Sequence, residues 1–195
     1  MAARAHLNLM FIQTEATPNP NVLKFLPGRI VSPDGPLDFP TQAEAAASPL
    51  ARALFEVDGV AGVFFGAEAI SVTRLAEGPS WSEMKAPVLA AVMDHFTSGA
   101  PLVVGQAAET EAETGEDSEI VAEIKGLLDS RIRPAVAQDG GDILFDRFDE
   151  ATGTLYLRMR GACAGCPSSS ATLKAGVEQM MRHYVPEVER VEQIL

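Results

Sequence analysis

The sequence lacks a long apolar run, an export signal and any concentration of basic residues. No apolar stretch approaches the ~20 residues that a membrane-spanning helix needs, and the longest, at residues 7–12, is interrupted by Asn8. The N-terminus carries Arg4 but neither an apolar core nor an Ala-x-Ala cleavage motif. With a net charge of −12 and no basic stripe, we expect neither a membrane nor a nucleic acid as a partner.

Cysteine is also scarce, since Cys163 and Cys166 are the only two in 195 residues. Without an export signal, both are expected in a reducing compartment. There a Cys-x-x-Cys pair binds metal or undergoes redox chemistry more often than it forms a structural disulfide. The pair is therefore the first candidate for a functional site.

The acidic residues divide the chain. Residues 106–119 hold six acidic and no basic side chains, and almost no large apolar ones, so this stretch cannot bury enough surface to order itself. A chain of this length accommodates two small domains. We predict one domain at residues 9–104 and a second at 119–195, joined by an acidic flexible linker at 105–118.

Hydrophobic periodicity and turn residues predict a mixed α/β (α+β) fold. In the first domain they predict strands at 9–13 and 22–26, a helix from about Pro49 to Gly59, a hairpin of strands 60–65 and 69–73, and a helix from Ser80 or Ser82 to Gly99. Glu83 stands three residues after Ser80, which indicates a capping box at the start of that helix.

The second domain is predicted as an α-β-β-α-β unit. The pattern gives a helix at 120–132 that Pro134 kinks or ends, a hairpin of strands 143–148 and 154–160, a helix at 168–184 and a strand from 188. Alternation in the second hairpin strand predicts that Leu155, Leu157 and Met159 face the core. The turn at 139–142, Asp-Gly-Gly-Asp, is interpreted as a connection between helix and strand.

The cysteine pair is predicted where a strand ends and a helix begins, in residues 161–167 (GACAGCP). Gly161 and Gly165 would leave room for backbone N–H groups to approach cluster sulfides. Pro167 suits the first helical position. The helix dipole, with Arg160 and Lys174 as further sources of positive charge, is expected to lower the pKa of the thiols toward the thiolates that bind metal.

The number of cysteines points to a second chain. A cubane cluster takes four thiolates and one chain offers two, so a two-fold symmetric dimer is the simplest closure. The motif alone leaves open a dimer bridged by zinc on four cysteines and thiol–disulfide exchange within the pair. The three histidines, His6, His95 and His183, are isolated and are interpreted as surface or capping residues.

Residues 132–142 (IRPAVAQDGGD) and 159–169 (MRGACAGCPSS) resemble the Nfu family of iron–sulfur cluster proteins, whose C-terminal domain is shared with NifU. Residues 11–21 (FIQTEATPNPN), 23–27 and 60–66 are similar to the Nfu N-terminal domain. The resemblance covers nearly the whole chain. The polar, proline-rich segment 17–21 is interpreted either as a structural turn or as a contact with another protein.

The resemblance implies a non-enzymatic scaffold or carrier. It would bind a [4Fe–4S] cluster through Cys163 and Cys166 of each of two chains, with a [2Fe–2S] form under some conditions. It would receive the cluster from upstream assembly proteins and deliver it to apo-proteins. Because no long targeting extension is present, we expect a bacterial cytoplasmic protein, with a processed form in the mitochondrial matrix as the alternative.

Overall fold

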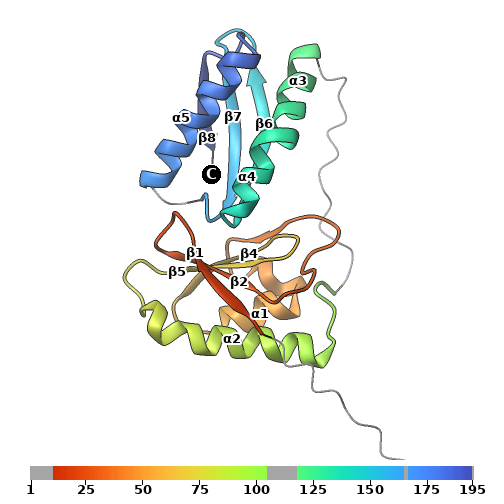
Figure 1. The fold of residues 1–195 in the computed structure, drawn as a ribbon, viewed down its shortest axis with the longest axis vertical. Helices are drawn as coiled ribbons and strands as arrows, with labels where there is room; N and C mark the ends of the chain where they lie inside the picture. The colour runs from red at the N-terminus through yellow and green to blue at the C-terminus, as the bar shows by residue number, and fades with distance from the viewer. Residues whose placement is uncertain (1–10, 105–117, 165–166, 195) are drawn as a thin grey trace, which may run out of the picture.

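The computed structural model describes residues 11–104, 118–164 and 167–194. It contains a five-stranded sheet followed by a three-stranded sheet, each with its own helices and its own apolar core. The second sheet and its helices stand upright on one face of the first sheet (Figure 1). In the described part of the chain, no helix is long and apolar enough to cross a bilayer.

The first sheet is antiparallel throughout, with the strand order β1-β2-β5-β4-β3. Its elements are β1 Gln13–Ala16, β2 Val22–Leu26, β3 Leu37–Phe39, a 3-10 helix at Glu44–Ala47, α1 Pro49–Phe55, β4 Val60–Phe65, β5 Ile70–Arg74 and α2 Trp81–Ser98. Helices α1 and α2 pack on one face, where Phe25, Leu50, Ile70 and Val88 are fully buried. The backbone N–H of Ser80 donates to Glu83 Oε2 at 2.9 Å, which confirms the capping box.

The structure corrects one expectation for this domain and adds two short elements that were not predicted. The strand expected at 9–13 begins only at Gln13 among the described residues. The short strand β3 and the 3-10 helix were not predicted, because three or four residues are too few to show a period. The predicted linker lies outside the described residues except for Ser118, whose side chain accepts a hydrogen bond from Val121 N.

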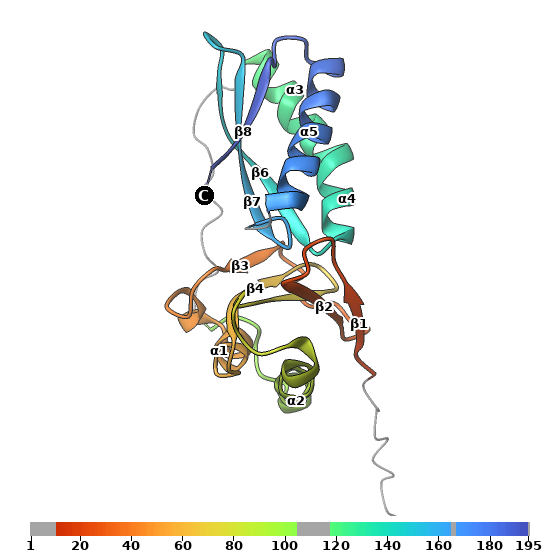
Figure 2. The same ribbon diagram turned by 90° about the vertical axis from the view of Figure 1, so that its left-hand side faces the viewer.

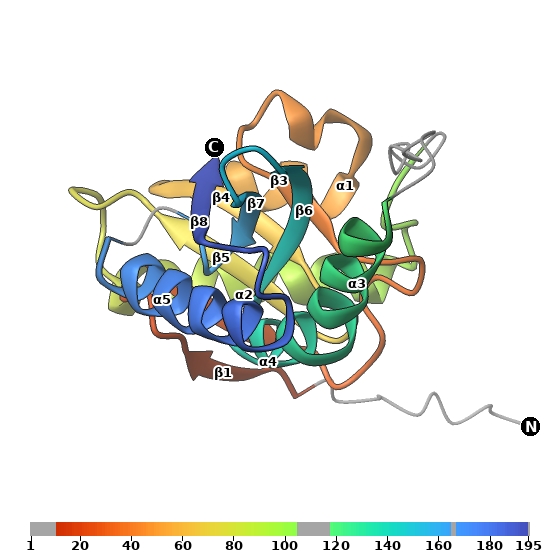
Figure 3. The ribbon, with the colours of Figure 1, turned by 90° about the horizontal axis from the view of Figure 1, so that it is seen from above.

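The second domain has the predicted α-β-β-α-β order. Its elements are α3 Glu119–Leu127, a π-helical turn at Leu128–Ile132, α4 Arg133–Gln138, β6 Gly141–Asp149, β7 Thr154–Gly161, α5 Pro167–Tyr184 and β8 Arg190–Ile194. β7 lies between antiparallel β6 and parallel β8. All three helices cover one side of this sheet (Figure 3), and the predicted inward residues Leu155, Leu157 and Met159 are buried there.

One cross-strand row of the first sheet faces the second domain. Across the strand register, Glu15 lies opposite Lys24, Lys24 opposite Ser71, Ser71 opposite Phe64, and Phe64 opposite Asp38. We call these five residues the docking row. Because side chains alternate between the two faces of a strand, the row points away from α1 and α2. Lys24, Phe64 and Ser71 are nevertheless buried, because the second domain covers them.

Pro134 does not end the helical segment, contrary to one of the two predicted outcomes. The π-helical turn directly precedes it, and the N–H of Arg133 bonds to Leu128 O, five residues back. A wider turn of this kind accommodates a proline, which has no N–H to donate. The segment thereby carries Arg133 to the buried Asp142 at the start of β6.

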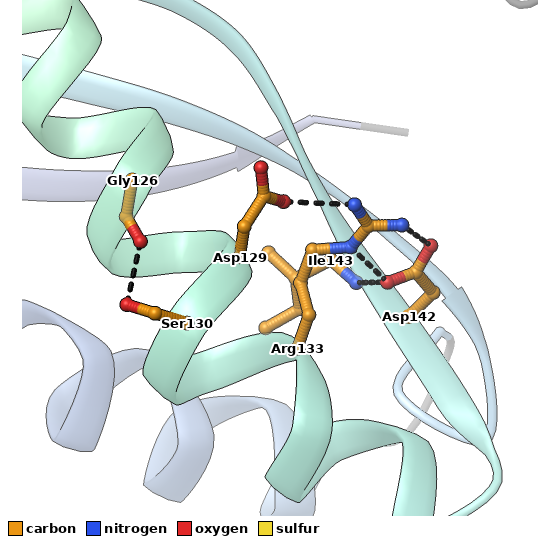
Figure 4. A network of polar contacts seen from close by, with 6 residues as sticks. All are labelled: Gly126, Asp129, Ser130, Arg133, Asp142 and Ile143. Carbon is orange, nitrogen blue, oxygen red and sulfur yellow. Dashed lines mark hydrogen bonds and ion pairs between the residues drawn. The ribbon is translucent and has the colours of Figure 1, made fainter.

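Arg133 binds Asp142 through two parallel hydrogen bonds (Figure 4), Nε to Oδ1 at 2.8 Å and Nη2 to Oδ2 at 3.0 Å. The N–H of Ile143 also donates to Asp142 Oδ1 at 2.9 Å. The hydrogen bond from Arg133 to Asp142 is the main cause that raises the pKa of Arg133 above its ordinary value. Asp129 adds a third contact to Arg133, at 2.8 Å, from an exposed position.

We predict that Asp142→Asn lowers the free energy of unfolding by about 2–3 kcal/mol, because it removes a charge-assisted pair at a buried carboxylate. Asp129→Asn is the matched control. It removes a contact of the same length to the same arginine, but an exposed pair contributes only about 0.5 kcal/mol. Urea unfolding followed by far-ultraviolet circular dichroism measures both. Equal losses in the two variants would contradict this difference between them.

Candidate functional site

Cys163 lies in the turn that follows β7, at the end of the second sheet that meets the first domain. Its side chain is buried, at 6% exposure, and belongs to the apolar core of the second domain. Hydrogen bonds from Ala162 N to Gly140 O (3.1 Å) and from Ala164 N to Gly161 O (3.0 Å) shape the turn. Cys166 lies outside the described residues, whereas α5 begins at Pro167, as predicted.

Gly141 forms the wall against which the Cys163 sulfur packs. A Cβ at this position would lie 2.6 Å from Cys163 Sγ, 2.7 Å from Arg160 O and 3.0 Å from Cys163 N. No side chain fits in that space, so position 141 must be glycine for the sulfur to sit where it does. The sulfur of Cys163 is therefore in close contact with the backbone of Gly141.

Gly161, at the end of β7, is in close contact with a side chain of the first domain. Its φ of +61° favours glycine, and a Cβ there would lie 2.8 Å from Cγ of Phe64 in the docking row. The sequence predicted that this glycine leaves space for cluster sulfides. In the structure that space is filled by the Phe64 ring.

The electrostatics of Cys163 also differ from the prediction. Burial raises the pKa of the thiol to about 12, and the negative charges of Asp139 and Asp142 act in the same direction. The expected lowering toward the thiolate is therefore wrong for Cys163 in this arrangement. Lys174, which was expected to contribute positive charge, is instead paired with Glu192 at 2.7 Å.

Asn19 contacts the Cys163 turn and was not identified from the sequence as a site residue. Its Nδ2 donates to Ala162 O and to Ala164 O, each at 3.3 Å, and its side chain is buried. The β1–β2 loop that carries it rises from the first sheet to the base of the second domain (Figure 2). The proline-rich segment 17–21 was the available signal, since it was interpreted as a turn or a contact.

Asp38, at the opposite end of the docking row, lies near Arg160 and Gly161. Its pKa is raised to about 6, chiefly by burial, although the positive charge of Arg160 and the backbone N–H of Gly161 lower it. An aspartate in water has a pKa of about 3.9 and is therefore ionised at pH 6. Residues of the second domain thus affect the pKa of an aspartate in the first domain.

The remaining candidates do not join the site. His95 is buried in α2 rather than on the surface, and His183 is exposed at the far end of α5, where its ring packs edge-on against Tyr184. His6 lies outside the described residues. Among the residues that the structure describes, no three His, Cys, Asp or Glu side chains gather into a group that could hold a metal ion.

Comparison with known proteins gives a consistent result over both domains. The family model described as scaffold protein Nfu/NifU N terminal matches residues 12–99, and the one described as NifU-like domain matches residues 124–192. Among solved structures, a NifU-like protein from Saccharomyces cerevisiae is similar at 20% identity and a TM-score of 0.45, over 54% of this chain and 97% of that chain.

Several curated proteins are about half identical to the chain. The NFU1 iron-sulfur cluster scaffold homolog, mitochondrial, of Homo sapiens is 50% identical over 95% of this chain and 72% of its own length. NifU-like protein 4, mitochondrial, of Arabidopsis thaliana is 51% identical over 94% of this chain and 66% of its own length. The chain thus spans about two thirds of the length of these relatives. Their names support the mitochondrial alternative and not the bacterial cytoplasmic expectation.

We predict that Gly141→Ala displaces the Cys163 turn and lowers the free energy of unfolding of the second domain by about 1–3 kcal/mol, the usual cost of overpacking. Gly126→Ala is the control, because a Cβ at this position, near the end of α3, meets nothing within 4 Å. That change should stabilise the chain by up to about 1 kcal/mol. Urea titration distinguishes them, and a neutral Gly141→Ala would contradict the close contact with the sulfur.

Asp38 predicts a pH dependence. Its folded-state pKa of about 6 lies above the ordinary value of 3.8, so the folded chain binds the proton more tightly than the unfolded one. The free energy of unfolding should therefore fall as pH rises from about 4 to about 6, and stay lower above it. In Asp38→Asn the fall should be smaller by about 1–2 kcal/mol. Urea unfolding monitored by Trp81 fluorescence at pH 4.5 and 7 measures this change in the original chain and in Asp38→Asn. An identical change in both proteins would exclude Asp38 as its source.

Proposed function

The chain belongs to the Nfu family of iron–sulfur cluster scaffold proteins, and we propose that it holds one [4Fe–4S] cluster between two copies of itself and passes it to apo-proteins. The ligands would be Cys163 and Cys166 of each chain. The family is not a catalytic one, so the cluster is cargo and no reaction is assigned to the chain.

The observation that carries the proposal is the position of Cys163 in the turn after β7, beside the glycine wall formed by Gly141. Cys163 packs against Gly141, where any side chain would collide with its sulfur. Four thiolates complete a cubane cluster, and one chain has two cysteines. A second copy supplies the other two in the simplest symmetric assembly.

The alternative of thiol–disulfide exchange is disfavoured by the state of Cys163. A reactive cysteine needs a thiolate that is accessible and has a low pKa. Cys163 is buried, and its thiol pKa is raised to about 12. A metal centre, by contrast, displaces the proton from the sulfur as it binds. A zinc-bridged dimer uses the same ligands and is separated from the cluster by experiment.

The compartment follows the same line of inference. The human and Arabidopsis relatives are named as mitochondrial, which favours the mitochondrial alternative over the bacterial cytoplasm. Both compartments are reducing, and both would keep the cysteines available for metal. The partners would be apo-proteins that need a cluster and upstream proteins that supply it.

We expect anaerobic reconstitution with iron and sulfide to give a brown protein with about two iron and two sulfide per chain, the ratio of one [4Fe–4S] cluster per dimer. About one iron per chain would indicate a bridging [2Fe–2S] form. Cys163→Ser and Cys166→Ser should each abolish stable cluster binding, whereas the control His183→Ala should bind fully. Iron and sulfide analysis with visible absorption measures all four proteins.

Two outcomes would contradict the proposal. A colourless protein that retains zinc would support the zinc-bridged dimer, and a colourless, metal-free protein that reduces insulin catalytically would support thiol exchange. The assembly provides a further check, because the cluster should stabilise the dimer that it bridges. Removal of iron by a chelator should shift the sedimentation of the protein from dimer to monomer.

A further inference from the structure

Four hydrogen bonds between the two domains share one pattern, in which a side chain of the first domain donates to a backbone carbonyl of the second. They are Asn19 Nδ2 to Ala162 O and Ala164 O (3.3 Å each), Lys24 Nζ to Gln138 O (2.7 Å) and Ser71 Oγ to Gly140 O (2.7 Å). The acceptors lie in two loops, 138–140 and 162–164, and the second loop contains Cys163. The first domain thus makes hydrogen bonds to the backbone on both sides of Cys163.

Asn19 is itself rigidly held. Its Oδ1 accepts from Asn21 N at 3.0 Å, so its amide nitrogen is the atom that faces the cysteine turn. Thr17 Oγ1 donates to Asn19 O at 2.9 Å, and Trp81 Nε1 donates to Pro20 O at 3.1 Å. With two prolines in five residues, the loop has few other conformations to adopt. The loop therefore holds the side-chain amide of Asn19 in one position against the Cys163 turn.

We propose that Asn19 is a positioning residue which, with the docking row, latches the Cys163 turn in a closed form that the metal-free protein adopts. The latch acts on the backbone and not on the sulfur. Because the two carbonyls that flank Cys163 are bound to one amide, the turn cannot swing the sulfur out of the core of the second domain. Release of Asn19 frees the turn and uncovers the thiol.

The interface has the character of a separable contact. The two apolar cores share no residue, and the donors between the domains are polar side chains, with Phe64 against Gly161 as the close apolar contact. Relative motion of two domains in one chain is expected unless the interface between them is large and hydrophobic. The first domain also covers the end of the second sheet where a second copy would have to approach. This last step rests on the proposed function, whereas the latch itself does not.

Asn19→Asp tests the latch with little change of shape. The carboxylate keeps the oxygen that accepts from Asn21 N, but it replaces the donating nitrogen by an oxygen that faces two carbonyls. Asn21→Asp is the matched control. It introduces the same charge in the same loop, and the Asn21 side chain makes no hydrogen bond among those of the described residues.

The readout is the rate at which N-ethylmaleimide modifies metal-free Cys163 in full-length chains that carry Cys166→Ser. We expect Asn19→Asp to raise this rate about tenfold, the effect of losing two hydrogen bonds, and Asn21→Asp to leave it unchanged. An unchanged rate in Asn19→Asp, or equal increases in the two variants, would overturn the latch. Unfolding followed by Trp81 fluorescence establishes that the first domain stays folded.

Ser71→Ala is the second variant, and it does not touch the loop. It removes the donor to Gly140 O and should raise the modification rate in the same direction, by several-fold. Unaltered reactivity in Ser71→Ala and Asn19→Asp together would exclude any role of the docking row. Because these measurements use metal-free protein, they are independent of cluster reconstitution, which tests the proposed function.

In chains with both cysteines, Asn19→Asp should also accelerate cluster uptake from iron and sulfide, and slower uptake would contradict the closed form.

Discussion

The structure depends on one contact, in which a single cross-strand row of the first sheet meets the end of the second sheet that carries Cys163. Four strands of the first sheet place a side chain in that contact: Lys24 from β2, Asp38 from β3, Phe64 from β4 and Ser71 from β5. The contact at the docking row explains three features that are unusual for the outer face of a sheet. A lysine and a serine are buried in a small sheet, and the pKa of Asp38 is raised. Each is the result of covering the polar face of a sheet with a second domain.

The same contact accounts for the glycines around the cysteine. Gly141 gives room to the Cys163 sulfur within the second domain, and Gly161 gives room to Phe64 of the first. One glycine therefore serves the ligand and the other serves the domain contact, although the sequence places both beside the same turn. A side chain at position 141 would collide with the Cys163 sulfur, and one at position 161 would collide with Phe64.

Much of this arrangement is encoded locally and can be predicted from the sequence. The α+β class, the second domain's element order, the inward face of β7 and the capping box at Ser80 follow from periods and caps that a few residues define, and the non-catalytic scaffold family is confirmed by the relatives. The proposed role of Asn19 could not be predicted, because it arises from contacts with residues more than 140 positions away. The burial of Cys163 depends on how the core of the second domain packs, which a local pattern also does not show. Local patterns carry no information about such contacts. A lowered thiol pKa was inferred from the helix start, with Arg160 and Lys174 as further positive charges, whereas burial and the charges of Asp139 and Asp142 raise the pKa of Cys163.

Under the proposed function, the buried thiol of Cys163 would have to lose its proton and become accessible to the cluster, and movement of the turn would provide that access. A buried thiol with a pKa of about 12 is a poor nucleophile and is protected from oxidation, which suits a protein that waits without its cargo. As a ligand of the proposed cluster, Cys163 would instead lose its proton and face a second chain. Metal binding therefore favours whichever arrangement exposes the sulfur, and the free energy of domain contact is subtracted from the free energy of cluster binding. A first domain that contributes no ligand in the described structure would still set how tightly the cluster is held, and a weakly held cluster is one that an apo-protein can take.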